Sequence, residues 1–165
     1  MLVDEHDNAI GSADKLKAHE APGLLHRAFS VLLFNAGGEL LLQQRAFTKY
    51  HFPGLWTNTC CSHPRPGETV ADAARRRLDE ELGVHADIEP VGRFVYRAVD
   101  RQSGLVEHEL DHVLVGRFDG SPCPAPSEVA GWQWVAVPHL RRCLDRDAAR
   151  FTPWFPLVLD VVGAR

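Results

Sequence analysis

A thiol and an imidazole stand two residues apart in a segment rich in proline and glycine. Cys61 and His63 belong to the stretch W-T-N-T-C-C-S-H-P-R-P-G, and the residues that follow reach the acidic pair Glu80-Glu81 just before Gly83. A loop that carries a thiol, followed by a helix that supplies carboxylates, is a layout suited to metal-dependent phosphate chemistry. The remaining ligands must come from elsewhere in the chain.

Two carboxylates, Glu107 and Glu109, are two residues apart in a predicted strand. Side chains at positions i and i+2 of a strand point to the same side of the sheet. Two carboxylates on one side repel each other unless they share a cation or a proton. Considered alone, the pair is better explained as solvated acids on an exposed edge strand, because charged residues lie mostly at the surface.

Nine histidines are present, and three of them could act together with these carboxylates. His19, His26 and His63 are far apart in the sequence, and each one considered singly is a surface or core residue rather than a ligand. Imidazoles and carboxylates together suit Mg, Mn, Fe or Zn, and oxygen-rich sites favour Mg and Mn. The group is therefore a candidate metal site that only the fold can assemble.

Three cations flank the Pro/Gly-rich segment or stand on the helix after it: Arg45, Lys49 and Arg77. Arginine binds phosphate oxygens through paired hydrogen bonds, so such a cluster suits a diphosphate. Each cation taken alone is ordinary surface charge, and Lys15 is a weaker candidate for the same role.

Cys61 and the tryptophans each have a plain structural explanation as well. In the structural explanation, Cys61 is a small buried apolar side chain. In the functional explanation, a nearby metal or cation lowers the pKa of its thiol and makes it reactive. The tryptophans are expected in the core, although one that faced a pocket would stabilise a cation through its π face. They are Trp56, Trp132, Trp134 and Trp154.

The elements that position these residues follow from the apolar pattern and the turn residues. Strands are predicted over 28–34, 40–45, 94–99, 106–118 and 132–137, helices over 70–82, 138–146 and 151–162, and an irregular segment over 46–66. Thr69 caps the first helix and Gly83 ends it. One face of this helix carries Val70, Ala73, Ala74, Leu78 and Glu81, so the Glu81 side chain is expected to point inward.

Composition limits the class of protein. The chain has 165 residues, 45% hydrophobic residues and a formal net charge of −4, which predicts one globular domain over 1–165 and gives no reason to expect nucleic-acid or membrane binding. Four cysteines without a C-x-x-C pair predict neither a disulfide framework nor a zinc site. The N-terminal residues lack the pattern of a signal peptide, so a cytoplasmic protein is expected.

The segment Ser62 to Val84 resembles the Nudix box, G-x5-E-x7-R-E-U-x-E-E-x-G-U, in which U is apolar. Glu68 and Arg76 match the pattern, as do Glu80, Glu81 and Gly83, whereas Ser62 replaces a glycine and Arg77 replaces a glutamate. Other motifs extend the resemblance from about Lys15 to Trp154 and are similar to type I isopentenyl-diphosphate Δ-isomerases. These motifs are H-R-A-F-S-V-L-L-F-N, L-L-L-Q-Q-R-A-F-T-K, T-N-T-C-C-S-H-P, Y-R-A, G-L-V-E-H-E-L-D-H and F-T-P-W-F.

The resemblance implies an α+β fold, a Nudix-type α/β/α sandwich with a mixed β-sheet. It also implies a five-ligand site for Mn²⁺ or Mg²⁺, a second Mg²⁺ on Glu81 that bridges to a diphosphate, and two acid/base groups, with Trp154 against the hydrocarbon tail. The five ligands would be His19, His26, His63, Glu107 and Glu109; the diphosphate would be held by Lys15, Arg45, Lys49 and Arg77; and proton transfer would be carried out by Cys61 and by Glu109 assisted by Tyr96.

The activity implied by the resemblance is isomerisation of isopentenyl diphosphate to dimethylallyl diphosphate, by a monomer whose only partner is this small molecule. Two alternatives remain at this stage. A Nudix diphosphohydrolase would use the same helix, although Arg77 removes one of its carboxylates. A Nudix-like binding module would need no metal, although every proposed ligand is present.

Overall fold

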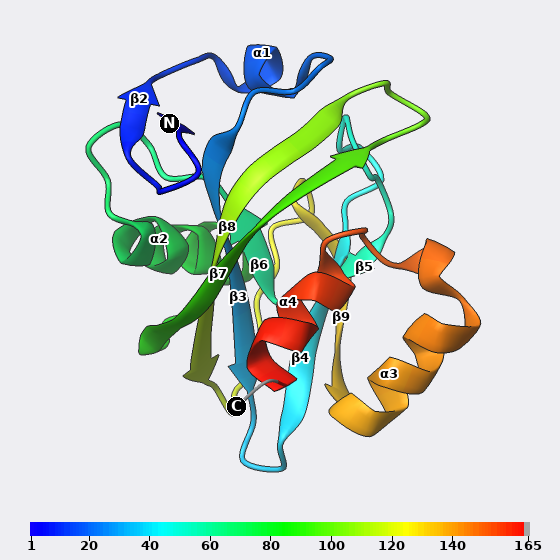
Figure 1. Ribbon diagram of the computed structural model, residues 1–165. Helices are drawn as coiled ribbons and strands as arrows, with labels where there is room; N and C mark the ends of the chain where they lie inside the picture. Colours follow the sequence, from blue (N-terminus) through cyan, green and yellow to red (C-terminus); the bar gives the residue numbers. More distant parts are fainter. Residues whose placement is uncertain (164–165) are drawn as a thin grey trace.

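A mixed β-sheet runs through the centre of the molecule in the computed structural model, which describes residues 1–163 (Figure 1). The strands are β1 (Leu2–Val3), β2 (Ala9–Gly11), β3 (His26–Phe34), β4 (Glu39–Arg45), β5 (Trp56–Thr57), β6 (Cys60–Ser62), β7 (Ile88–Val99), β8 (Val106–Arg117) and β9 (Val129–Ala136). The helices are α1 (Lys15–His19), α2 (Val70–Leu82), α3 (Val137–Arg146) and α4 (Phe155–Gly163), with a short 3₁₀ turn, η1 (Ala148–Arg150).

Strand β3 is the centre of the sheet. It runs parallel to β8 over its whole length, from His26 opposite Glu109 to Phe34 opposite Arg117, and β6 pairs with it antiparallel. Beyond β8 lies the antiparallel β7, and β4 pairs antiparallel with β5 and β9. The sheet is therefore mixed, as the sequence predicted, and β8 is an interior strand with a neighbour on each side.

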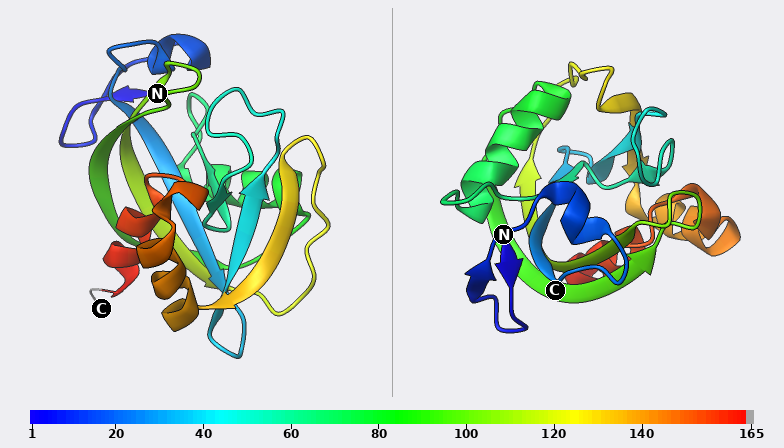
Figure 2. Two further views of the ribbon diagram at one scale, coloured as in Figure 1. Left: turned by 90° about the vertical axis from the view of Figure 1, so that its right-hand side faces the viewer. Right: turned by 90° about the horizontal axis from the view of Figure 1, so that it is seen from above.

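Helices cover both faces of the sheet, α2 on one and α4 on the other (Figure 2). Because successive side chains of a strand point to opposite faces, β3 contributes to two cores. Val31 and Leu33 pack in the cluster that contains the apolar face of α2, whereas Leu32 packs in the cluster that contains Phe155 and Leu159 of α4. The expected α/β/α sandwich is confirmed.

Helix α2 has the ends that its sequence predicts. The Thr69 hydroxyl accepts a hydrogen bond from the Asp72 N–H at 3.1 Å, and Gly83 closes the helix in the left-handed conformation, with φ of 62°. A residue with a side chain is strained at that φ, so glycine is favoured there. Glu81 is 3% exposed and points inward, as predicted.

The segment over 46–66 was predicted to be irregular throughout, and this is wrong in part. It contains β5, which pairs with β4, and β6, which pairs with β3. These strands have two and three residues, too short for a period of two to be recognised in the sequence. Their pairing matters because it fixes the backbone of Cys61.

The last helix begins later than predicted, at Phe155 rather than at residue 151. Phe151 forms a parallel bridge with Trp56, and the Thr152 N–H donates to the Trp56 carbonyl at 3.0 Å. The Thr152 N–H is therefore engaged with β5, and the α-helical hydrogen bonds begin only beyond it, where the Val158 N–H donates to the Trp154 carbonyl at 3.0 Å. This docking positions Trp154 before α4 begins.

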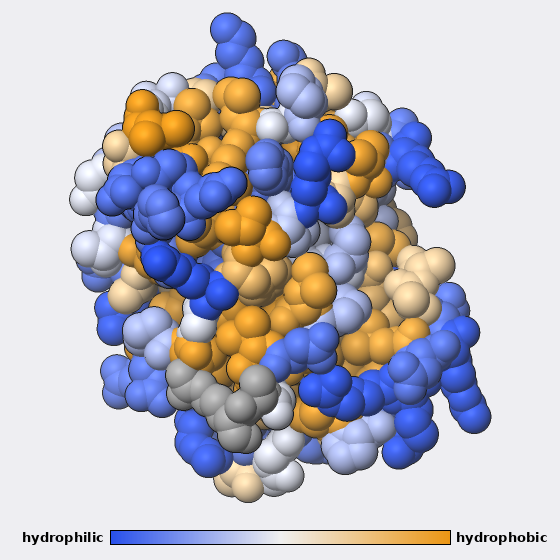
Figure 3. Space-filling view, in the orientation of Figure 1, coloured by the Kyte–Doolittle hydropathy of each residue, from blue (hydrophilic) through white to orange (hydrophobic). Residues whose placement is uncertain are grey.

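Strand β7 is longer than predicted, from Ile88 rather than from residue 94, because the antiparallel pairing with β8 continues through a bulge near Pro90 and Gly92. Apolar surface lies over the middle of the face seen in Figure 3, and Val95 and Val99 of β7 and Leu157 of α4 are exposed. Within residues 1–163, no helix combines the length and apolar character needed to cross a membrane.

Candidate functional site

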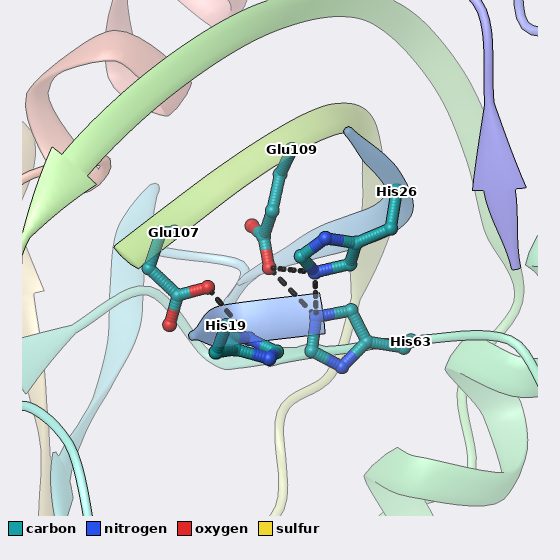
Figure 4. Close-up of side chains that lie close together, drawn as sticks. All are labelled: His19, His26, His63, Glu107 and Glu109. Atoms are coloured by element: carbon teal, nitrogen blue, oxygen red, sulfur yellow. Dashed lines mark hydrogen bonds and ion pairs between the residues drawn. The ribbon is translucent and has the colours of Figure 1, made fainter. Parts of the chain in front are cut away.

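Three imidazoles and two carboxylates converge at one end of the sheet (Figure 4). Their ligand atoms all lie within 4.8 Å of one another, although the residues come from four separate segments. His19 is the last residue of α1, His26 the first of β3, and His63 follows β6, whereas Glu107 and Glu109 lie on β8. The parallel pairing of β3 with β8 brings His26 beside the two carboxylates, and the pairing of β6 with β3 brings His63 to the same end of the sheet.

Backbone carbonyls fix the orientation of two of these rings. His19 Nδ1 lies 2.6 Å from the Lys15 carbonyl oxygen, and His26 Nδ1 lies 2.8 Å from that of Leu24. A carbonyl only accepts hydrogen bonds, so in each neutral ring Nδ1 carries the proton and Nε2 presents a lone pair. Metal-binding histidines are commonly held in this way.

The Nε2 atoms of His19 and His26, which present lone pairs, face carboxylate oxygens rather than donors. The Nε2 atoms of His26 and His63 are 3.1 Å apart and lie 3.4 and 2.7 Å from Oε1 of Glu109. His19 Nε2 is 2.9 Å from Oε2 of Glu107, yet neither atom makes a hydrogen bond within residues 1–163. Lone pairs and carboxylate oxygens held together out of water repel each other, and a shared divalent cation removes this repulsion. The donor set thus fits a divalent metal.

The alternative of solvated acids on an edge strand is wrong. Glu107 is 3% exposed and Glu109 is 7% exposed. Strand β8 lies between β3 and β7, and the carboxylates point from it toward the histidines. A tertiary environment that brings imidazoles to both carboxylates overrides the general preference of acids for the surface.

The adjacent cysteines lie on opposite faces of the sheet because they are successive residues of β6. Cys60 is fully buried in the core cluster beneath α2, whereas Cys61 faces the other side and lines a narrow cavity. Burial raises the pKa of Cys61 to about 12, and the nearby Arg45 guanidinium only partly opposes this. Cys61 is therefore a thiol, and not a thiolate, near neutral pH.

Glu109 has a second partner across the same cavity. The Tyr96 hydroxyl donates to Glu109 Oε2 at 2.5 Å, from the position on β7 directly opposite Glu109 in the antiparallel register. Burial, followed by the charge of Glu109, raises the pKa of Tyr96 well above its ordinary value. The phenol thus keeps its proton and holds one carboxylate oxygen while the other faces the histidines.

The narrow cavity measures about 60 Å³ and joins the candidate metal ligands to an aromatic wall. Trp154 lines it and is 3% exposed, with the Arg45 guanidinium carbon 5.5 Å from its ring. A wider hollow of about 540 Å³ adjoins it, and the two share Lys15, Lys49, Tyr50, Ser62, His63 and Arg77. Cations thus occupy the passage between a small inner chamber and an open outer one.

All four predicted cations line the narrow cavity, and Lys15, Lys49 and Arg77 also line the outer hollow. Three of the four are held by protein oxygen atoms. Arg77 contacts Glu81 at 2.5 Å, Glu80 at 2.8 Å and Glu128 at 3.0 Å. Burial opposes charge on Arg77, but these carboxylates raise its pKa. Arg45 donates to the carbonyls of His51 and Phe52, Lys49 pairs with Glu128, and the Lys15 ammonium lies over the Tyr50 ring.

Two residues of this site, His51 and Glu128, were missed by the sequence analysis. His51 contacts Glu107, and Glu128 joins Lys49 to Arg77. Each is an isolated polar residue in a loop or at the start of a strand, with no spacing that ties it to the other ligands. For His51, the high histidine count was a signal, since it stands in the long segment before Pro53-Gly54.

Asp111 and His112 follow the two carboxylates on β8 and point to opposite faces. Asp111 is 1% exposed, accepts a hydrogen bond from the Ser30 hydroxyl at 2.8 Å, and has its pKa raised well above the ordinary value by burial and by Glu109. His112 pairs with Asp7 at 2.9 Å on the other side of the sheet. It is therefore part of the N-terminal packing and not of the candidate metal centre.

Comparison with known proteins identifies the family. The NUDIX domain model matches residues 24–155. A protein of Nocardia farcinica named isopentenyl-diphosphate Delta-isomerase is 53% identical over 163 residues, which cover 99% of this chain and 93% of the relative. A protein of the same name from Serratia proteamaculans is 50% identical, with 99% and 90% covered. The chain belongs to the isopentenyl-diphosphate Delta-isomerase family.

Solved structures agree on the fold of this isopentenyl-diphosphate Delta-isomerase family member. A crystal structure of a Deinococcus radiodurans protein superposes with a TM-score of 0.76 at 26% identity, covering 97% of this chain and 96% of that chain. A MutT protein from Methanosarcina mazei superposes with a TM-score of 0.67 at 17% identity, covering 82% and 91%. At the latter identity the likeness concerns the Nudix fold alone.

Proposed function

We propose that the protein isomerises isopentenyl diphosphate to dimethylallyl diphosphate by protonation and deprotonation through a tertiary carbocation. One observation carries the proposal: a thiol, Cys61, and a carboxylate, Glu109, line a single narrow cavity whose mouth is ringed by cations. The reaction needs one group to add a proton at one carbon and another to remove a proton from a different carbon. A diphosphate at the mouth would leave the hydrocarbon part in the cavity.

The two acid/base groups have complementary environments. An unactivated alkene is a very poor base, so a positioned acid that still carries its proton is required. Cys61 carries its proton, but burial that raises its pKa also makes it a weak acid, so its candidacy rests on its place in the same cavity as the metal-side carboxylate rather than on acidity. Glu109, held by the Tyr96 hydroxyl at 2.5 Å, would be the second group. The number of protons on the substrate does not change, since one proton is added at one carbon and one is removed from another.

Trp154 would protect the carbocation. Its ring lines the cavity, and a π face stabilises a cation without forming a bond to it. Phe52 packs edge-on against the ring at 5.4 Å, and Tyr96 lies 6.2 Å away. An aromatic wall also excludes water, which would otherwise capture the cation as an alcohol.

Metal ions would be held at two places. Five residues fit a site for Mn²⁺ or Mg²⁺, and Glu81 is a candidate for a second Mg²⁺ beside the diphosphate: the five are His19, His26, His63, Glu107 and Glu109. When bound, such ions supply positive charge that tunes a carboxylate and neutralises phosphate oxygens. Gln43 donates to Glu81 at 3.0 Å and orients that carboxylate.

The diphosphate would replace carboxylates as the partner of the cations. Arg77 and Lys49 both contact Glu128, and Arg77 also contacts Glu81. Arginine suits planar recognition of phosphate oxygens. Arg77 stands where a hydrolytic Nudix box has a glutamate, so this helix would bind a diphosphate rather than support its hydrolysis. Binding energy at this remote group then orients the alkene.

Proton NMR of isopentenyl diphosphate in deuterated water, with Mg²⁺ and Mn²⁺ supplied, tests the proposal. The wild type should produce dimethylallyl diphosphate and incorporate deuterium. Cys61→Ala should lose about 10²–10⁴-fold in rate, the contribution of a general acid. Cys60→Ala is the matched control because its thiol lies on the other face of β6, and it should retain activity.

A diphosphohydrolase would give a different result with the same substrate. Metal-dependent release of phosphate from isopentenyl diphosphate or a nucleoside diphosphate, without isomerisation, would overturn the proposal. Equal deuterium incorporation by Cys61→Ala and the wild type would remove Cys61 from its assigned role.

A further inference from the structure

His51 lies beside the candidate metal ligands without being one of them. It stands in the loop between β4 and β5 and is 6% exposed. Its Nε2 atom is 2.6 Å from Oε1 of Glu107, whereas its Nδ1 atom has no hydrogen-bond partner among residues 1–163. Its ring centroid is 5.4 Å from that of His19. A buried imidazole with one strong contact needs an explanation.

The two oxygens of Glu107 face different neighbours. Oε2 lies 2.9 Å from His19 Nε2, on the side of the candidate metal centre, and Oε1 faces His51. An ionised carboxylate only accepts hydrogen bonds, so a ring nitrogen 2.6 Å away must carry the proton. Arg45 Nη2 lies farther from the same nitrogen, at 3.5 Å, so the shorter contact places the Nε2 proton toward Oε1. This contact fixes the rotation of the carboxylate and leaves Oε2 directed at His19.

The backbone of His51 is held independently of its ring. Arg45 donates from Nη2 to the His51 carbonyl at 3.0 Å and from Nε to the Phe52 carbonyl at 3.0 Å. The Phe52 N–H in turn donates to Asp100 Oδ2 at 3.2 Å. The loop thus presents the imidazole from a fixed position. Replacing the ring leaves the two carbonyl contacts to Arg45 in place and removes only the longer contact between Arg45 Nη2 and His51 Nε2, at 3.5 Å.

We propose that His51 is a positioning residue that holds Glu107 in the orientation needed to bind the divalent cation. The inference rests on the metal site of the proposed function, but not on the isomerase reaction itself. Hydrogen bonds to a metal-binding carboxylate from outside the ligand set hold its geometry, and their loss commonly lowers metal affinity about 10–100-fold.

Two substitutions separate the hydrogen bond from the bulk of the ring. His51→Leu fills the space but cannot donate, whereas His51→Gln retains an N–H donor. Binding of Mn²⁺ to the full-length protein without substrate is measured by equilibrium dialysis, and the bound ion is examined by electron paramagnetic resonance. His51→Leu should bind Mn²⁺ about 10–100-fold more weakly with an altered spectrum, and His51→Gln should stay within about threefold of the wild type.

His85→Leu is the control for loss of an imidazole, because the His85 side chain is 83% exposed. It should bind Mn²⁺ like the wild type. At saturating Mn²⁺, KM of His51→Leu for isopentenyl diphosphate should be unchanged because the backbone still holds Arg45, whereas kcat should fall. Circular dichroism verifies folding, and His51→Ala replaces the leucine variant, with the same expectation, if that variant does not fold.

Each alternative result has one meaning. Wild-type Mn²⁺ affinity and spectrum in His51→Leu would overturn the inference. Equal weakening in His51→Leu and His51→Gln would overturn the role of the hydrogen bond. A wild type that binds Mn²⁺ with this dependence on His51, but does not isomerise the substrate, would overturn the proposed function and leave the inference supported.

Discussion

At the scale of single residues, the local backbone decides which of two chemically similar side chains can act. Cys60 and Cys61 are adjacent, yet strand geometry sends the first into the core beneath α2 and the second into the cavity. Glu107 and Glu109 share a face by the same geometry. Chemical type selects the candidates, and the alternation of the strand determines which of them reach the site.

The hydrogen bond from Tyr96 to Glu109 provides a prediction at this scale. Tyr96→Phe removes a 2.5 Å hydrogen bond to a buried carboxylate while keeping the ring. Because a hydrogen bond to a charged group contributes about 1.5–3 kcal/mol, we expect kcat for isomerisation to fall about 10–100-fold. Glu109 is also a candidate metal ligand, so Mn²⁺ affinity should fall as well. Steady-state kinetics measures the first and equilibrium dialysis the second. Unchanged kcat would show that Glu109 does not need this partner.

At the scale of elements, α2 is held at its start by an ion pair as well as by its cap. Arg76 donates from Nε and Nη2 to the two oxygens of Glu68, at 2.7 and 2.9 Å, which ties the loop before the helix to its middle. This Arg76 hydrogen bond is the main cause that lowers the pKa of Glu68 to about 2. The pair thus stabilises the loop that follows His63.

The ion pair predicts a pH dependence of stability. A carboxylate whose pKa is lowered on folding stabilises the folded state above its unfolded pKa, and this contribution is lost as pH falls. For Glu68 the loss should extend from the ordinary value of 4.5 to about 2. Since the pair is partly exposed, solvent screening limits it to about 1 kcal/mol. Glu68→Gln should therefore lower the free energy of unfolding at pH 7 by this amount, and by less at pH 3.

Urea unfolding of both proteins across this pH range measures the difference. Glu89→Gln, at an exposed position of β7, is the control and should show no comparable difference at either pH. A destabilisation by Glu68→Gln that is the same at pH 7 and pH 3 would contradict the ion-pair explanation.

At the scale of the whole molecule, one binding event would join four distant segments. The candidate metal ligands come from the end of α1, the start of β3, the loop after β6, and β8. The unfolded chain has no preformed site, so binding free energy adds to the free energy of folding. Burial of repelling groups without the cation costs stability that the cation would restore.

Metal should therefore stabilise the protein against heat. At a Mn²⁺ concentration about 100 times Kd, the free energy of unfolding should rise by about 2.7 kcal/mol over a chelator-treated sample. Differential scanning calorimetry would measure the rise in Tm. His26→Ala, which removes a ligand, should abolish the increase. An identical Tm with metal and with chelator would contradict the candidate metal centre.

Much of the fold could be predicted from local pattern. Thr69, the apolar face of α2 and Gly83 define that helix by short-range capping and periodicity, and its boundaries are confirmed. Strands β5 and β6 were not predicted, because two or three residues have no readable period and form only by pairing with β4 and β3. The late start of α4 has the same cause, since Phe151 and Thr152 bond to Trp56.

Sequence by itself determined the chemical types available in the stretch Trp56 to Val84: a thiol, a histidine, and a Nudix helix in which Arg77 replaces a carboxylate. Tertiary structure decided which groups meet. The parallel pairing of β3 with β8 brings His26 beside Glu109, and only the folded loop between β4 and β5 brings His51 to Glu107. Contacts between residues far apart in sequence depend on packing of the whole sheet, because no local spacing encodes them.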